Sequence, residues 1–130
     1  MKQAHPHLEL ARSLWSAAAE GDAPAVRSVL NDAVVWRSTG LSRLSGEYRG
    51  PDGVLEYLVE VGEAVDELTS RIDDVFVSDD GAVIAYHVSA RRGSKSLEMD
   101  YLLRLRIRGG RIVEGLVVPV DQRENDDFWP

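Results

Sequence analysis

A change in hydrophobic period midway along the chain is the feature that most constrains its fold. From residue 70 on, four segments have the β-branched and aromatic content of strands, and short turns rich in Gly, Asp or Ser separate them. Before that point, most apolar residues recur at helical spacing. Helices followed by an antiparallel run predict an α+β domain with the helices packed on one sheet face. The four predicted strands are 70–80, 82–92, 96–108 and 111–121.

The first half of the chain is predicted to hold three helices and one strand. Helix formers and apolar spacing predict a first helix over 8–20 and a short second helix over 23–30. The segment "AVVWRS" (33–38) is β-branched and aromatic, which indicates a strand. A glycine-punctuated loop over 39–50 follows. A third helix is predicted over 51–68, with its apolar residues on one face.

Length and charge narrow the class of protein. The 130 residues fit a single domain spanning 1–130, large enough to bury a core, and no cysteine is present for disulfides. A net charge of -7 repels phosphate backbones, so nucleic acid is not expected as a partner. No apolar run is long enough for a membrane helix, and no signal-peptide core appears at the start. We expect a cytoplasmic protein without a membrane partner.

Five short motifs in a fixed order carry a resemblance to a known superfamily. Each is weak alone, but their order and spacing are specific for a fold. The chain resembles the nuclear transport factor two-like superfamily, in its SnoaL-like and ketosteroid-isomerase-like branch. The motifs are "AAAEGD" (17–22), "VVW" (34–36), "LSGEYRG" (44–50), "RIRGGRIVE" (106–114) and "DQRENDDFW" (121–129).

The resemblance implies a cone-shaped α+β barrel, with three N-terminal helices packed on a curved mixed, mostly antiparallel sheet. It also implies an apolar pocket inside the cone, homodimers that pair through the outer sheet face, and no cofactor. It does not specify an activity, because isomerases, cyclases, hydrolases and plain binders share this fold.

The catalytic candidates are Arg37, His87 and Asp100. Ketosteroid isomerase uses an Asp base together with an oxyanion hole of Tyr and a protonated Asp. The position of that base, carried over by the resemblance, falls on Arg37, which cannot act as a base near neutral pH. Arg37 can bind an anionic or carbonyl ligand, or pair with a nearby acid. The sequence leaves both alternatives open.

His87 and Asp100 lie inside predicted strands. Tyr86 and His87 occupy opposite faces, so at most one of them reaches the interior of a regular strand. A mid-strand histidine can be a general base or a satisfied core or interface residue. Asp100 alternates with Tyr101 and is expected to point away from the apolar face unless a bulge turns it inward. Its alternative is an exposed or cross-strand-paired acid.

The remaining candidates form an apolar pocket wall. At three positions where relatives often carry polar residues, this chain has Leu103, Leu116 and Val117, and this favours ligand binding over acid–base chemistry. The expected ligand-binding residues are Trp15, Trp36, Tyr57, Tyr101, Leu103, Leu116 and Val117.

Two further predictions concern the two ends of the chain. Phe128 and Trp129 follow an acidic run, and the resemblance implies that this tail folds back onto the body or a partner subunit. His5 and His7 offer two imidazoles with no third ligand nearby, so no metal site is expected.

The sequence therefore favours a SnoaL-like domain whose apolar pocket binds a small hydrophobic molecule. The alternative is an isomerase, cyclase or hydrolase that acts on a cyclic substrate by acid–base chemistry, of the ketosteroid-isomerase-like or polyketide-cyclase-like type.

Overall fold

Two consecutive helices begin the described part of the chain, residues 5–130 of a computed structural model. His5 caps the first helix, because its ring Nδ1 accepts from the His7 backbone N–H at 3.1 Å. Gly21, at φ 67°, ends that helix in the left-handed conformation that glycine adopts most readily. Asp22 then caps the second helix by accepting from Ala25 N–H at 3.2 Å. The helices are α1 (Pro6–Glu20), α2 (Ala23–Val29), α3 (Gly50–Glu63) and α4 (Gln122–Phe128).

The six described strands form one mixed sheet in the order β2-β1-β6-β5-β4-β3. Only the pair β1–β6 is parallel; the other neighbours are antiparallel, as the sequence predicted. The register shifts once in β3, between Ile72 and Asp74, and once where β5 faces β6. Such bulges bend a sheet and increase its twist. The strands are β1 (Leu30–Ser38), β2 (Gly46–Arg49), β3 (Glu67–Ser78), β4 (Gly81–Arg92), β5 (Lys95–Arg108) and β6 (Arg111–Pro119).

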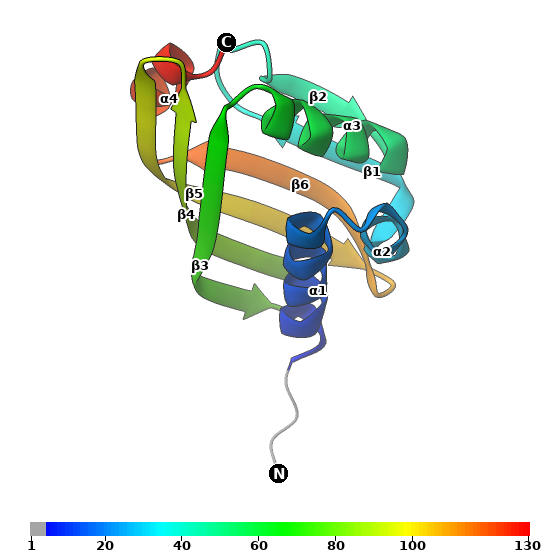
Figure 1. Cartoon of the computed structure of the whole chain (residues 1–130). Helices are drawn as coiled ribbons and strands as arrows, with labels where there is room; N and C mark the ends of the chain where they lie inside the picture. The colour runs from blue at the N-terminus through cyan, green and yellow to red at the C-terminus, as the bar shows by residue number, and fades with distance from the viewer. Residues whose placement is uncertain (1–4) are drawn as a thin grey trace.

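The sheet curves around helices on its inner side. In Figure 1, α1 crosses in front of the strands, α3 runs along β1 and β2, and α4 lies at one end of the β4–β5 hairpin. Residues of β5 are alternately buried and exposed from Leu97 to Ile107, so one face of the strand meets the helices and the other faces outward. The sheet does not close, and the fold is consistent with the predicted cone-shaped α+β barrel.

Three local elements differ from the sequence prediction. Helix α3 ends at Glu63, five residues before the predicted end, because Leu68 pairs with Ala90 in the β3–β4 ladder. A short strand, β2, lies in the predicted loop 39–50 and pairs with β1. The acidic tail contains α4, capped by Asp121, which accepts from Glu124 N–H at 3.0 Å.

In the part of the chain that the structure describes, every helix is too short or too polar to cross a membrane.

Candidate functional site

A cavity of about 170 Å³ lies between the inner face of the sheet and helices α1 and α3. Its walls are dominated by aliphatic and aromatic side chains, and none of the lining residues is Asp, Glu, His, Lys or Arg. The lining consists of Leu14, Trp15, Ala18, Trp36, Ser38, Ser42, Leu44, Tyr57, Leu58, Val61, Leu68, Ser70, Ile84, Tyr86, Val88, Tyr101, Leu103, Val117, Pro119, Asn125 and Trp129.

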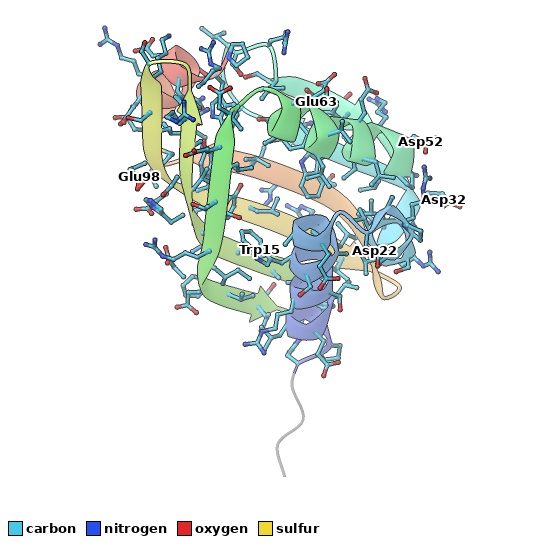
Figure 2. All side chains as sticks on the ribbon, viewed as in Figure 1. Trp15, Asp22, Asp32, Asp52, Glu63 and Glu98 are labelled. Carbon is cyan, nitrogen blue, oxygen red and sulfur yellow. The ribbon has the colours of Figure 1, made fainter. Side chains whose placement is uncertain are left out.

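Aromatic rings from α1, β4 and β5 form one side of the cavity. Trp15 meets Tyr86 edge to face at 5.1 Å, and Tyr86 stacks on Tyr101 at 5.3 Å between ring centroids. Figure 2 shows Trp15 between α1 and the strands. Edge-to-face and offset-stacked pairs are the arrangements that aromatic rings favour, so this wall is held in place by its own contacts.

The parallel strand pair β1–β6 forms another side. Trp36 and Gly115 are partners in the ladder, and the six-membered ring of Trp36 lies over the Gly115 backbone. A Cβ atom at position 115 would be 2.3 Å from Cε3 of Trp36, so only glycine leaves room for the ring. The indole Nε1 of Trp36 is the one fully enclosed side-chain polar atom without a hydrogen-bond partner among residues 5–130.

The C-terminal segment closes one end of the cavity. Trp129 is 8% exposed, and its Nε1 donates to the Tyr101 hydroxyl and to Oδ1 of Asn125, both at 3.1 Å. The Tyr101 hydroxyl also donates to Oδ1 of Asn125. Phe128 is 3% exposed and packs edge to face on Trp129, with 5.0 Å between ring centroids. The tail therefore supplies part of the cavity wall.

Backbone contacts hold this segment on the body of the same chain. The Arg92 guanidinium donates to the Phe128 carbonyl oxygen from Nε at 2.9 Å and from Nη2 at 2.5 Å. Lys95 Nζ donates to the Asp127 carbonyl oxygen at 2.9 Å, and the Arg43 N–H donates to Pro130 O at 2.6 Å. The prediction that the aromatic tail folds back onto the body is confirmed.

The three tyrosines that line the cavity stay protonated at neutral pH. Burial raises the pKa of Tyr57 to about 12 and that of Tyr101 to about 12, because a phenolate loses its hydration there. Burial also raises the pKa of Tyr86 well above its usual value. These hydroxyls can therefore donate hydrogen bonds, but none can take up a proton as a base near pH 7.

The structure places Arg37 on the outer face of β1, outside the cavity lining. Its guanidinium pairs with Glu47 at 3.1 Å across the β1–β2 ladder, and its side chain is 51% exposed. Glu47 also pairs with Arg49 at 2.7 Å, and the hydrogen bond from Arg49 is the main reason that the pKa of Glu47 is lowered. Of the two alternatives for Arg37, pairing with a nearby acid is the one that the structure shows.

His87 and Asp100 also lie on the outer face, opposite each other in the β4–β5 ladder. His87 Nδ1 is 2.8 Å from Asp100 Oδ1, and its Nε2 is 3.5 Å from Oε1 of Glu98. The ladder is regular at Asp100, so no bulge turns that carboxylate inward, and its side chain is 63% exposed. Figure 2 shows Glu98 pointing outward from β5. Neither His87 nor Asp100 reaches the cavity.

The His87 cluster predicts a stability contribution that depends on pH. The hydrogen bond to Asp100 raises the pKa of His87, with a smaller contribution from Glu98, while partial loss of hydration and the charge of Arg71 oppose the increase. Because the folded-state pKa lies above the unfolded value, the stabilisation is complete below about pH 6.5 and is lost as the pH rises through the folded pKa. We expect His87→Gln to lower the free energy of unfolding more at about pH 5.5 than at about pH 8.5. Equal losses at both pH values, measured by urea denaturation, would contradict this.

Most predicted pocket residues line the cavity, and one does not. Trp15, Trp36, Tyr57, Tyr101, Leu103 and Val117 are in the lining. Leu116 is not, because it alternates with Val117 in β6 and so lies on the outer face, where it pairs with Arg37 and Arg104 in the two ladders. Asn125 and the serines at 38, 42 and 70 also line the cavity and were not predicted from the sequence, because their positions in the lining depend on long-range packing.

His5 and His7 both make hydrogen-bonding contacts at the start of α1. His7 Nδ1 lies 2.7 Å from the Ser78 carbonyl oxygen, and His5 caps the helix. Within residues 5–130, no three His, Asp or Glu side chains gather where they could hold a metal ion.

Comparison with known proteins assigns the fold to a family. The family model described as the SnoaL-like domain matches residues 11–115. The chain belongs to the SnoaL-like domain family. This SnoaL-like protein is 31% identical over 124 residues to the uncharacterized protein Rv0034 of Mycobacterium tuberculosis, covering 94% of this chain and 95% of that protein.

Solved structures share the shape of this SnoaL-like protein. A protein of unknown function with a cystatin-like fold from Xanthomonas campestris matches with a TM-score of 0.85 and 30% identity, over 95% of this chain and 97% of that one. Bal32a, from a soil-derived mobile gene cassette, matches with a TM-score of 0.90 and 23% identity, over 96% and 97%. Others are described as NTF2-like and ketosteroid isomerase-like. The predicted superfamily, the nuclear transport factor two-like superfamily in its SnoaL-like branch, is confirmed.

Proposed function

We propose that this SnoaL-like protein binds a small, neutral, mainly apolar molecule in the cavity between the sheet and helices α1 and α3. The observation that carries the proposal is the composition of the lining, which combines leucine, valine and aromatic side chains with a few hydroxyls and one amide. Ligand sites typically combine an apolar wall with a small number of polar groups that orient the ligand. A charged ligand would lose its hydration there without gaining a counter-charge.

The volume of the cavity limits the size of the ligand. An engineered cavity of about 150 Å³ accepts benzene, whereas sites for drug-sized ligands span roughly 300–1,000 Å³. At about 170 Å³, this cavity suits a molecule of one or two rings, such as a bicyclic ketone or a monoterpenoid. A four-ring steroid would require the walls to move apart.

The chemistry of the lining favours binding over acid–base catalysis. An isomerase or cyclase needs a group near the substrate that takes up and releases a proton near neutral pH. Among the described lining residues the titratable groups are tyrosines, and burial raises their pKa values to about 12 or above their usual range. They can polarise a carbonyl as hydrogen-bond donors, which is the one feature that supports the enzymatic alternative.

A calorimetric titration tests the proposal. The probes are indane, 1-indanone and menthone as small ligands, and a steroid ketone as a large one. We expect the small probes to bind with micromolar to millimolar dissociation constants and a negative heat-capacity change, since apolar surface is buried. The steroid should bind more weakly. If none of the small probes binds, the proposal is wrong.

A cavity-filling variant locates the ligand in that titration. Leu103 is 6% exposed and lines the cavity, so the larger side chain of Leu103→Trp occupies the space that a ligand would take. We expect this variant to fold and to lose binding of every small probe. Arg104→Trp is the matched control, because the next residue of β5 faces outward. Unchanged binding in Leu103→Trp would place the ligand elsewhere.

We also propose that two copies pair through the outer face of the sheet. Leu102 is 44% exposed on β5, and Leu116 and Val118 lie near it in the β5–β6 ladder, so this face offers apolar surface for a second copy. Sedimentation is expected to give a dimer at micromolar concentration, and Leu102→Glu to give a monomer. Val59→Glu, an exposed position on α3, is the control. A wild-type monomer would contradict this proposal.

A further inference from the structure

Asn125 is a buried polar residue at the end of the cavity that α4 closes. It is 6% exposed, and among residues 5–130 it is the one buried residue with a polar or charged side chain. It also belongs to the cavity lining. A buried amide is costly unless its donors and acceptors are satisfied, so each of its two polar atoms needs a partner.

The contacts of Asn125 fix which of its two polar atoms is the oxygen. The indole Nε1 of Trp129 is a donor only, and it lies 3.1 Å from the atom assigned as Oδ1. The Tyr101 hydroxyl contacts the same atom and itself receives the Trp129 N–H at 3.1 Å. An oxygen accepts from both of these groups, whereas an amide nitrogen in that place would face the indole N–H with its own hydrogens. The flipped amide is therefore excluded.

This orientation leaves the Nδ2 group with two hydrogens and no hydrogen-bond partner among residues 5–130. Among these residues, Nε1 of Trp36 is the one side-chain polar atom that is both fully enclosed and without a hydrogen-bond partner. Since Nδ2 of Asn125 also lacks a partner but is not fully enclosed, it borders open space. Asn125 is buried and lines the cavity, so we assign this open space next to Nδ2 to the cavity. Asn125 thus supplies the one side-chain amide in a wall that is otherwise made of apolar groups and a few hydroxyls.

We propose that Nδ2 of Asn125 donates a hydrogen bond to a carbonyl oxygen of the bound ligand and so selects ketone-bearing molecules over the matching hydrocarbons. The inference rests on the proposed function and specifies the ligand class for the same cavity. A neutral carbonyl fits better than a carboxylate, because no cation lines the cavity to compensate a buried negative charge. Tyr101 and Trp129 hold Oδ1 and thereby keep the amide hydrogens directed away from themselves.

The test compares two probes that differ by one carbonyl group, 1-indanone and indane, by calorimetry at about pH 8, where carboxylates are normally ionised. The measured quantity is the dissociation constant of indane divided by that of 1-indanone. Asn125→Asp keeps oxygens that can accept from Tyr101 and Trp129, and these two hydrogen bonds favour the ionised carboxylate, which has no donor. We expect this variant to lower the ratio at least about fivefold, which corresponds to one hydrogen bond. Arg123→Ala, an exposed position on α4, should leave the ratio unchanged.

A measurement on the wild-type protein covers the case in which Asn125→Asp does not fold. The side-chain amide resonances of Asn125 in a nitrogen-15 NMR spectrum should shift when 1-indanone is added and should shift much less with indane. The role of Asn125 would be overturned if the resonances shifted equally with both probes. It would also be overturned if they did not shift although both probes bind. An unchanged ratio in the folded variant would overturn it as well.

Failure of this inference is distinguishable from failure of the proposed function. If neither probe binds the wild-type protein, both the cavity proposal and the role of Asn125 are wrong. If both probes bind and Leu103→Trp abolishes their binding, but the ratio does not respond to Asn125→Asp, only the role of Asn125 is wrong.

Discussion

Removal of residues 126–130 is expected to lower the free energy of unfolding by about 5 kcal/mol or more, since truncating a single buried Phe or Trp to Ala costs about 3–5 kcal/mol. The deletion removes Phe128 and Trp129, which are 3% and 8% exposed, and with them the indole donor to Tyr101 and Asn125. It also removes the carbonyl oxygen that accepts from Arg92. Urea denaturation monitored by circular dichroism measures the effect.

Two control variants separate the aromatic contacts from the length of the segment. Trp129→Ala should account for a large share of the loss, because the indole packs on Phe128 and donates two hydrogen bonds. Arg123→Ala, on the exposed side of α4, should change the unfolding free energy by less than about 0.5 kcal/mol. An unfolding midpoint unchanged by the deletion would show that the tail contributes nothing to the fold.

Gly115→Ala is expected to destabilise the protein by about 1–3 kcal/mol and to weaken ligand binding, because it forces an overpacked wall to rearrange. The new methyl group would lie 2.3 Å from Cε3 and 2.4 Å from Cζ3 of Trp36, so the indole must move. The cavity is the open space next to Trp36, and the displaced ring would occupy part of it. The free energy of indane binding should therefore decrease by more than the free energy of unfolding does.

The control for this substitution is the same change at a glycine with free space. A Cβ at Gly62, near the end of α3, meets nothing within 4 Å. Gly62→Ala should stabilise the helix by about 0.5–1 kcal/mol, because alanine loses less backbone entropy. If Gly115→Ala were as benign as Gly62→Ala, the close packing of Trp36 on β6 would be wrong.

The sheet was predictable because its signals are local. Strict alternation from Leu97 to Ile107 shows which face of β5 is buried. The two-residue turn at Gly93 and Ser94 sets the β4–β5 register, and that register places His87 opposite Asp100. The outward position of Asp100 followed from the same alternation. Each of these predictions rests on the two-residue alternation of a strand, and packing between distant residues does not change that alternation here.

What the sequence did not predict depends on contacts between distant residues. Leu68 continues the apolar spacing of α3, but its pairing with Ala90 in the sheet ends the helix earlier. Leu116 and Val117 were both assigned to the pocket wall, although neighbouring residues in a strand face opposite sides. Nothing local marks Asn125 within an acidic run, because its partner Tyr101 lies 24 residues away.

The central claim is that the space between the sheet and helices α1 and α3 is an apolar hollow that accepts a ligand. The most direct measurement is a crystal structure of the protein under xenon pressure, since dry apolar cavities take up xenon. We expect a xenon peak in contact with Leu103, Tyr86 and Val117. A collapsed interior without xenon, or a chain of ordered waters filling the same space, would contradict the claim.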